Sequence, residues 1–324
     1  MGLEVFLIII GFFLLIKGAD FLVDGASNIA KKFHIPEIVV GLTIVSIGTS
    51  MPELIVSSVS AIQGHSDIAI GNVVGSNIAN LFLILGICAI IKPLEFKKQT
   101  RLIENPITLL VTVILLILCN NGATNETKFI TTNEGFILLA ICIVFIIYNI
   151  FMAKNGEKID ADEKSNMSLI EYKNISIVKS IVSVVIGIIA LKFGGDLVVN
   201  NSVTIATMLG VSEKLISLTI IAFSTSLPEL ITSVIASKKG ETDMAIGNIL
   251  GSQIFNILLI IGVSAILNPI VYSVLYNKDI ILLIIGTVML ELFPFTGKKN
   301  TMTRLNGLLF VLIYIIYMTH LVLN

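Results

Sequence analysis

Long apolar runs alternate with short polar segments along almost the whole chain. Most runs are about 20 residues long or more, which is the length that an α-helix needs to cross the hydrocarbon core of a bilayer. They predict ten membrane spans, at 3–30, 36–62, 67–91, 103–119, 131–153, 177–206, 213–237, 243–267, 279–295 and 303–322. The first and sixth runs are long, so we expect these two helices to be tilted.

The composition supports a membrane protein. Of the 324 residues, 55% are hydrophobic and 13% are charged, whereas a soluble domain carries about 25% charged residues. The N-terminal run lacks the basic segment and cleavage site of a secretory signal, so we expect it to be retained. The net charge of −1 argues against a nucleic-acid partner. The sequence also lacks a P-loop motif, which argues against transport driven by ATP.

No residue set suggests an enzyme or a resident cofactor. Cys88, Cys119 and Cys142 lie in apolar runs and match neither a metal site nor a disulfide framework. No nucleophile–base set is evident, and no obligatory protein partner is implied. The chemistry of this chain must therefore be sought in its intramembrane polar residues.

The second half of the chain repeats the first at a constant offset of 176 residues. Residues 41–94 align with 217–270, with 26 identities in 54 positions, so the repeat is a duplication. Each half holds five spans, and this odd number inverts the second half in the membrane, as in many secondary transporters. We predict an all-α polytopic fold with a first repeat at 1–153, a hydrophilic linker at 154–174 and a second repeat at 175–324.

Basic residues predict the orientation of the chain. Sixteen of the 21 lysines and arginines fall in the loops after odd-numbered spans, and three, Lys128, Lys214 and Lys278, fall on the opposite face. The positive-inside rule places the richer face in the cytoplasm. Both termini are then extracellular and 154–174 is cytoplasmic. We expect the chain to lie in the plasma membrane.

Each repeat places a glutamate directly after a proline within an apolar run. The segments are Thr49-Ser50-Met51-Pro52-Glu53 and Thr225-Ser226-Leu227-Pro228-Glu229. Proline frees backbone carbonyls near 48–49 and 224–225. Thr49 and Glu53 share a helix face, and Ser46 lies next to it. One broken turn therefore offers a carboxylate, hydroxyls and free carbonyls, all of which are oxygen ligands.

The following span of each repeat carries a polar stripe at intervals of four residues. The stripes are Asn72, Ser76, Asn80 and Asn248, Ser252, Asn256. Gly71, Gly75, Gly247 and Gly251 would let another helix approach closely. Asparagines in such helices often only join helices to each other, so the stripes alone do not establish ligands.

The paired glutamates favour a cation site. A buried carboxylate is costly unless it is neutralised, either by a proton in a structural role or by a bound cation. Oxygen ligands suit Ca²⁺, Mg²⁺ or Na⁺, and Mg²⁺ tends to avoid all-protein cages. Two carboxylates balance one Ca²⁺ or two Na⁺, and competition for one site would couple the two ions. Lys17 and Lys192 could instead indicate an anion, but ion pairing or snorkelling is favoured.

At these residues the sequence resembles the cation/calcium exchanger superfamily, and within it a prokaryotic sodium/calcium exchanger. The resemblance lies in Gly-Thr-Ser-Met-Pro-Glu at 48–53, Ser-Thr-Ser-Leu-Pro-Glu at 224–229, and Gly-Asn-x-x-Gly-Ser at 71–76 and 247–252. It implies a ten-helix fold that transports Ca²⁺ and Na⁺. The implied ion ligands are Glu53, Glu229, Thr49, Thr225, Ser50, Ser226, Ser76, Ser252, Asn80, Asn256, and the backbone oxygens of Ser46 and Ala222.

Some positions depart from the family pattern. Ser224 replaces a glycine, and both Asn80 and Asn256 are amides where one aspartate is common. Gly75 and Gly251 stand where calcium/proton exchangers carry a glutamate, which favours the sodium branch. The predicted function is Na⁺/Ca²⁺ antiport. The alternatives are a Ca²⁺/H⁺ or other cation/H⁺ antiporter and, in another class, a cation channel with a glutamate ring.

Overall fold

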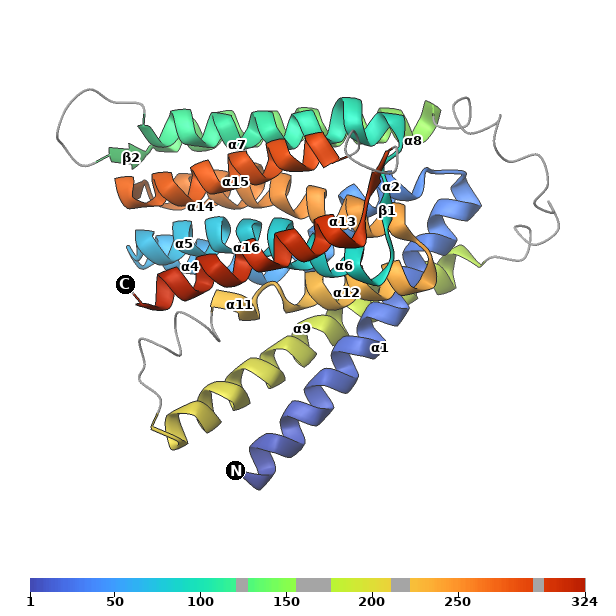
Figure 1. Cartoon of the computed structure of the whole chain (residues 1–324), viewed down its shortest axis with the longest axis horizontal. Coiled ribbons are helices and arrows are strands. Elements are labelled where there is room, and N and C mark those ends of the chain that lie inside the picture. Colours follow the sequence, from blue (N-terminus) through green and yellow to red (C-terminus); the bar gives the residue numbers. More distant parts are fainter. Residues whose placement is uncertain (121–127, 156–175, 211–221, 294–299, 324) are drawn as a thin grey trace.

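The computed structural model describes residues 1–120, 128–155, 176–210, 222–293 and 300–323, and these are almost entirely helical (Figure 1). The helical elements of the first repeat are α1 (Gly2–Phe33), α2 (Glu37–Val40), η1 (Gly41–Val45), α3 (Ser46–Thr49), α4 (Met51–Ile62), α5 (Ser66–Ile78), η2 (Ala79–Ile84), α6 (Leu85–Ile91), η3 (Thr100–Glu104), α7 (Asn105–Asn120) and α8 (Thr132–Asn155).

The described helical elements of the second repeat follow a similar order. They are α9 (Ile177–Met208), α11 (Ala222–Ser224), α12 (Leu227–Lys239), α13 (Thr242–Phe255), η7 (Asn256–Ile261), α14 (Gly262–Leu267), η8 (Val274–Tyr276), α15 (Asn277–Leu292) and α16 (Arg304–Leu323). Elements η1, η2, η3 and η7 are π-helical turns that continue the neighbouring α-helices.

The predicted spans agree with these elements. Each span has a helical counterpart whose described ends lie within three residues of the prediction. The start of the seventh span, at 213–221, and most of the linker at 154–174 lie outside the described residues. Helices α1 and α9 are each 32 residues long and run obliquely to the other helices in Figure 1, as expected for tilted spans. The chain is thus a multi-pass membrane protein.

Four short strands show that the two repeats are inverted. Strand β1 (Leu94–Glu95) pairs with β4 (Thr301–Met302), and β2 (Lys128–Ile130) pairs with β3 (Ile270–Tyr272), both antiparallel. Strands β1 and β3 follow equivalent helices of the two repeats. Nevertheless, β1 lies at one end of the helices and β2, the partner of β3, lies at the other (Figure 1). Equivalent segments therefore emerge on opposite faces.

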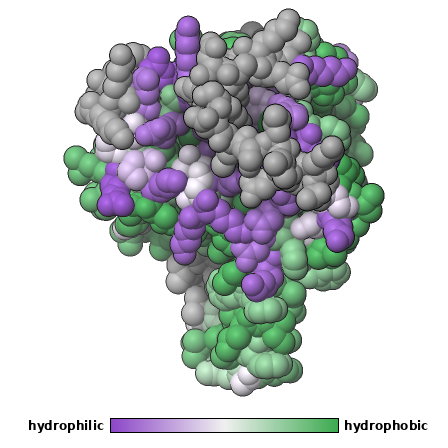
Figure 2. Space-filling model, turned by 90° about the vertical axis from the view of Figure 1, so that its right-hand side faces the viewer, coloured by the Kyte–Doolittle hydropathy of each residue, from purple (hydrophilic) through white to green (hydrophobic). Residues whose placement is uncertain are grey.

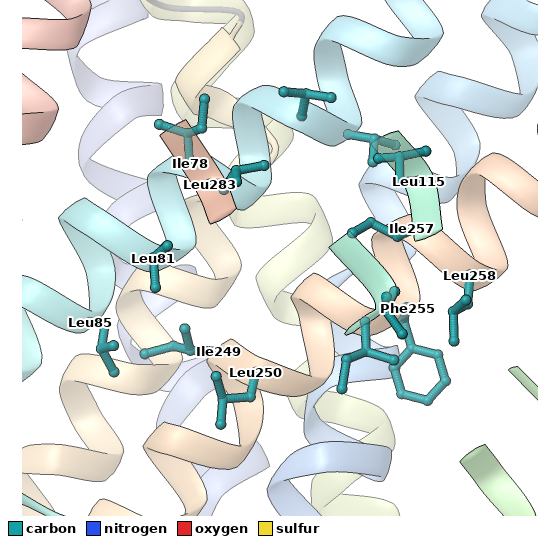
Figure 3. Close-up of a cluster of buried hydrophobic side chains, with 14 of the residues drawn as sticks. Ile78, Leu81, Leu85, Leu115, Ile249, Leu250, Phe255, Ile257, Leu258 and Leu283 are labelled. Atoms are coloured by element: carbon teal, nitrogen blue, oxygen red, sulfur yellow. The ribbon is translucent and has the colours of Figure 1, made fainter. Parts of the chain in front are cut away.

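Helices α5–α6 and α13–α14 form the centre of the bundle. In the most apolar 18-residue stretch of these two continuous spans, 72% and 83% of the residues are buried, against 11% in α16. Figure 3 shows how their side chains gather, with Leu81 and Leu85 of the first repeat near Ile249 and Leu250 of the second. All four are buried. The most enclosed helices are therefore the two that carry the polar stripes.

A polar cluster covers the end of the molecule where α1 and α12 terminate (Figure 2). Lys31 pairs with Glu241 at 3.2 Å, and Lys239 pairs with Asp24 at 2.7 Å, so α1 is joined to the second repeat here. Burial alone would raise the pKa of Glu241. Hydrogen bonds from neighbouring groups, of which Glu37 contributes most, followed by Ser27 and Lys31, outweigh it and hold the pKa below the usual value for a glutamate.

Two glycines of α13 allow this continuous span to contact the backbone of the broken span of the first repeat. A Cβ atom at Gly247 would lie 2.5 Å from the carbonyl oxygen of Ile38, and one at Gly251 would lie 2.8 Å from that of Leu42. The close approach predicted for these glycines is thus confirmed. Gly75 has no such neighbour among the described residues, and the equivalent of Leu42 in the second repeat lies outside them.

Replacing Gly247 with alanine should therefore destabilise the protein by about 1–3 kcal/mol, because the new methyl group would force α13 away from α2. Thermal unfolding in detergent measures this as a lower midpoint. Gly195→Ala in α9 is the matched control, because a Cβ atom there meets no described atom within 4 Å. Equal midpoints for the two variants would contradict this account of the contact.

Candidate cation site

A broken helix in each repeat carries the candidate site. The span 37–62 bends by 49° between Thr49 and Met51, and the second repeat breaks at the equivalent point between Ser224 and Leu227. Pro52 and Pro228 stand in the first turn of the helix that follows each break. There proline loses little, because the first N–H groups of a helix have no intrahelical partner. Glu53 and Glu229 therefore each lie in the first turn of a helix that begins in the protein interior.

Both glutamates are fully enclosed. Glu53 and Glu229 are 0% exposed, and among the described residues no salt bridge reaches either carboxylate. Glu229 accepts one hydrogen bond, from Ser50 Oγ to Oε1 at 3.0 Å. Oε2 of Glu229 and both oxygens of Glu53 accept none from the described residues. Three buried carboxylate oxygens therefore lack a hydrogen-bond donor among the described residues.

Hydroxyl groups of the broken helices are held by the polar stripes of the opposite repeat. Thr49 Oγ1 donates to Asn248 Oδ1, and Thr225 Oγ1 donates to Asn72 Oδ1, both at 3.1 Å. Ser76 Oγ lies 3.3 Å from Thr225 Oγ1. Since the threonine protons are engaged by the amides, the oxygen lone pairs of Thr49 and Thr225 remain able to coordinate a cation.

The remaining candidate side chains are buried. Ser226, Ser252, Asn80 and Asn256 are at most 1% exposed. Within the described part of the chain, the hydroxyls of Ser226 and Ser252 and the amide of Asn80 make no hydrogen bond. The polar atoms of Ser226, Ser252 and Asn80 are thus buried without a partner among the described residues, as expected if a ligand satisfies them.

The two predicted backbone ligands, the carbonyls of Ser46 and Ala222, differ in how much of their surroundings the structure describes. The carbonyl of Ser46 accepts from the Ser50 amide at 3.0 Å and more weakly, at 3.3 Å, from the Thr49 hydroxyl. The Thr49 hydroxyl has one proton and donates it at the shorter distance to Asn248. One lone pair of the Ser46 carbonyl is then free of a donor. Ala222 is the first residue of α11, directly after the undescribed segment 211–221. It keeps the position equivalent to Ser46 in the repeat.

Two serines support the site and were not among the predicted ligands. Asn72 Nδ2 donates to Ser57 Oγ, and Asn248 Nδ2 donates to Ser233 Oγ, both at 2.9 Å. Asn72 also donates to the carbonyl of Glu53 at 3.3 Å. Each serine follows its glutamate by four residues in both repeats, and this spacing could have identified it. Asn72 and Asn248 thus orient threonines, and the serines orient the asparagines.

The lysines within the long helices do not form an anion site. Lys192 pairs with Asp196 at 2.8 Å, and Lys17 lies 3.6 Å from Asp20. Each lysine and its partner are three or four residues apart on one helix surface and are partly exposed. The predicted ion pairing is confirmed. Neither lysine therefore neutralises Glu53 or Glu229, and two carboxyl groups without a cationic partner among the described residues suit a cation.

Comparison with known proteins identifies relatives over the whole chain. The family model described as sodium/calcium exchanger protein matches residues 3–151 and 179–323. A putative antiporter, CaxA of Alkalimonas amylolytica, is 36% identical, and the sodium/calcium exchanger MaX1 of Methanosarcina acetivorans is 32% identical; 96% of each chain is covered in both cases. A solved structure of the sodium-calcium exchanger NCX_Mj superposes with a TM-score of 0.82 at 32% identity, covering 98% of both chains.

Proposed function

Because this chain belongs to the sodium/calcium exchanger protein family, we propose that it exchanges Na⁺ for Ca²⁺ across the plasma membrane as a secondary active antiporter. The observation that carries the proposal is the pair of enclosed glutamates, Glu53 and Glu229, which no described cationic side chain neutralises. A carboxylate at the centre of a membrane costs about 2.5–3.5 kcal/mol on insertion scales, so two of them need a strong countercharge. One Ca²⁺ supplies it.

The types of ligand atom support a single site that binds either Ca²⁺ or Na⁺. The surrounding groups are carboxylate, hydroxyl, amide and carbonyl oxygens, and no cysteine or histidine is among them. Oxygen-only ligands match Ca²⁺ and Na⁺ and not zinc or copper. The same two carboxylates can balance either one Ca²⁺ or two Na⁺. The two ions would therefore compete, and each would leave as the other enters.

The arrangement of helices supports alternating access around a fixed site. Helices α1 and α9 pack against each other through glycines, where a Cβ atom at Gly18 would lie 2.9 Å from the carbonyl of Gly187. They diverge from the remaining helices in Figure 1. An apolar pocket of about 520 Å³ lies between the pair, α12 and α16, with Phe12, Val198, Leu227 and Tyr314 among its lining. We infer that this pair moves against the bundle to expose the site to either side.

Flux measurements test the proposed exchange. Proteoliposomes loaded with Na⁺ and diluted into Na⁺-free buffer should accumulate ⁴⁵Ca²⁺, and those without the gradient should not. Accumulation that follows an imposed pH gradient and ignores Na⁺ would instead indicate Ca²⁺/H⁺ antiport. Ca²⁺ entry that merely equilibrates, without concentration, would indicate a channel.

The orientation is a further expectation. In Figure 1 the N-terminus, at the lower tip of α1, and the C-terminus both lie toward the left-hand end, away from β1, which agrees with an even number of crossings. We propose that this end is extracellular, because the positive-inside rule places the lysine-rich loops in the cytoplasm. A cysteine introduced at Asn155, in a variant without the three native cysteines, should resist an impermeant thiol reagent in intact cells. It should react after permeabilisation. Labelling from outside would reverse the assignment.

A further inference from the structure

Two asparagines from opposite repeats meet beside the candidate site. Asn256, the first residue of η7, donates from Nδ2 to Oδ1 of Asn77 at 3.0 Å. Asn77, near the end of α5, donates from its own Nδ2 to the backbone carbonyl of Gln253 at 3.3 Å. Both asparagines are at most 1% exposed, so water competes little for these bonds. Asn77 is not one of the predicted ligands.

The backbone carbonyl determines the direction of this relay. A carbonyl can only accept a hydrogen bond, so the Gln253 carbonyl takes the amino end of Asn77. The oxygen of Asn77 then faces Asn256 and takes its amino end in turn. Oδ1 of Asn256 is left as the free end, and it accepts no hydrogen bond from the described residues. Only this oxygen end of the amide can coordinate a hard cation.

The equivalent relay is missing on the other side of the site. Gln253 occupies the repeat position of Asn77, and Asn80 occupies that of Asn256. Within the described residues, neither Nε2 of Gln253 nor either polar atom of the Asn80 side chain makes a hydrogen bond. The two central amides are therefore not equivalent, and only Asn256 is held with its oxygen presented.

We propose that Asn77 is a positioning residue that acts through Asn256 and directs an amide oxygen toward the transported cation. A carboxylate at position 256 would present oxygen whichever way it turned, whereas an amide needs a partner that sets its orientation. The inference rests on the proposed cation exchange at this site. It adds a residue that touches no ion and yet sets the affinity for one.

The test measures the Ca²⁺ concentration that half-saturates Na⁺-driven ⁴⁵Ca²⁺ uptake. Asn77→Leu removes both hydrogen-bonding ends at nearly constant volume. It should raise half-saturation roughly tenfold, because the Asn256 amide that loses its partner is no longer held with its oxygen toward the ion. Asn149→Leu is the control. Asn149 is equally buried in α8, and among the described residues its Nδ2 bonds only to the Phe145 carbonyl. It should leave half-saturation unchanged.

The same substitution in a second variant of the protein, Asn256→Asp, distinguishes a positioning role of Asn77 from a structural one. In an Asn256→Asp protein the orientation of residue 256 no longer matters, so adding Asn77→Leu should change half-saturation by less than about twofold. An equal loss in both backgrounds, or no loss in the native background, would overturn the proposal. If Asn77→Leu does not fold, Asn77→Ala, which introduces no bulk, takes its place in both backgrounds.

The controls also separate this inference from the proposed function. Wild-type protein that shows no Na⁺-driven uptake would refute the exchange activity and the inference together. Wild-type uptake that Asn77→Leu and Asn77→Ala leave unaltered would refute the inference alone and leave the exchange activity standing.

Discussion

Replacing either buried glutamate with glutamine, Glu53→Gln or Glu229→Gln, is expected to abolish Ca²⁺ transport while the protein still folds. The side chain keeps its size, but one of the two negative charges is lost. A divalent ion left under-neutralised at a buried site loses about 3–5 kcal/mol, which is more than a hundredfold in affinity. Na⁺-driven ⁴⁵Ca²⁺ uptake into proteoliposomes measures the effect, and size-exclusion chromatography checks the fold.

Glu104→Gln is the matched control. Glu104 is also 0% exposed, but it lies in η3 outside the broken helices, and its Oε1 accepts from Gln99 at 2.8 Å. This variant should retain transport. If Glu104→Gln lost as much uptake as the site variants, burial of charge in general, and not the site, would explain the loss. Near wild-type uptake by either site variant would refute a site shared by Glu53 and Glu229.

Transport should also respond strongly to membrane voltage. Asn80 and Asn256 are amides and do not ionise, so the site carries about two negative charges, from Glu53 and Glu229. One Ca²⁺ neutralises them, and a third Na⁺ would add an excess positive charge. Exchange of three Na⁺ for one Ca²⁺ moves one net charge, worth about 2.3 kcal/mol per 100 mV. The equilibrium Ca²⁺ gradient should then change about fiftyfold per 100 mV.

Proteoliposomes clamped with K⁺ and valinomycin at a series of potentials provide this measurement. The Na⁺ gradient is held constant while the final ⁴⁵Ca²⁺ accumulation is recorded. Vesicles at zero potential serve as the reference. Accumulation that ignores the potential would mean electroneutral exchange, with two Na⁺ per Ca²⁺ or a different coupling ion.

The sequence was sufficient to predict the spans and the repeat because both depend on local patterns. Hydropathy located α1 and α9 and implied their tilt, and the constant offset paired Glu53 with Glu229. The polar stripes at intervals of four residues were correctly placed on one face of their helices. These are periodicities within one element, which the geometry of the α-helix fixes without knowledge of neighbouring helices.

Contacts between the repeats could not be obtained in this way. Periodicity shows that Asn72 and Asn77 are helical, but not that one meets Thr225 and the other Asn256 across the repeat interface. Strand pairs such as β1–β4 are too short to show alternation. The π-helical turn at Asn256–Ile261 has no residue signature, although it begins at the site residue Asn256. Tertiary packing decides these features. The spacing of Ser57 and Ser233 from the glutamates marks them as candidates, but their hydrogen bonds with Asn72 and Asn248 are contacts that only the structure shows.

Equilibrium binding tests most directly whether Na⁺ and Ca²⁺ share one site. ⁴⁵Ca²⁺ binding to the purified protein is measured at increasing Na⁺, with choline replacing Na⁺ to keep ionic strength constant. A shared site predicts that Na⁺ raises the apparent Kd for Ca²⁺ while the number of Ca²⁺ ions bound at saturation stays the same. Ca²⁺ binding with a Kd that does not change as Na⁺ increases would contradict a shared site.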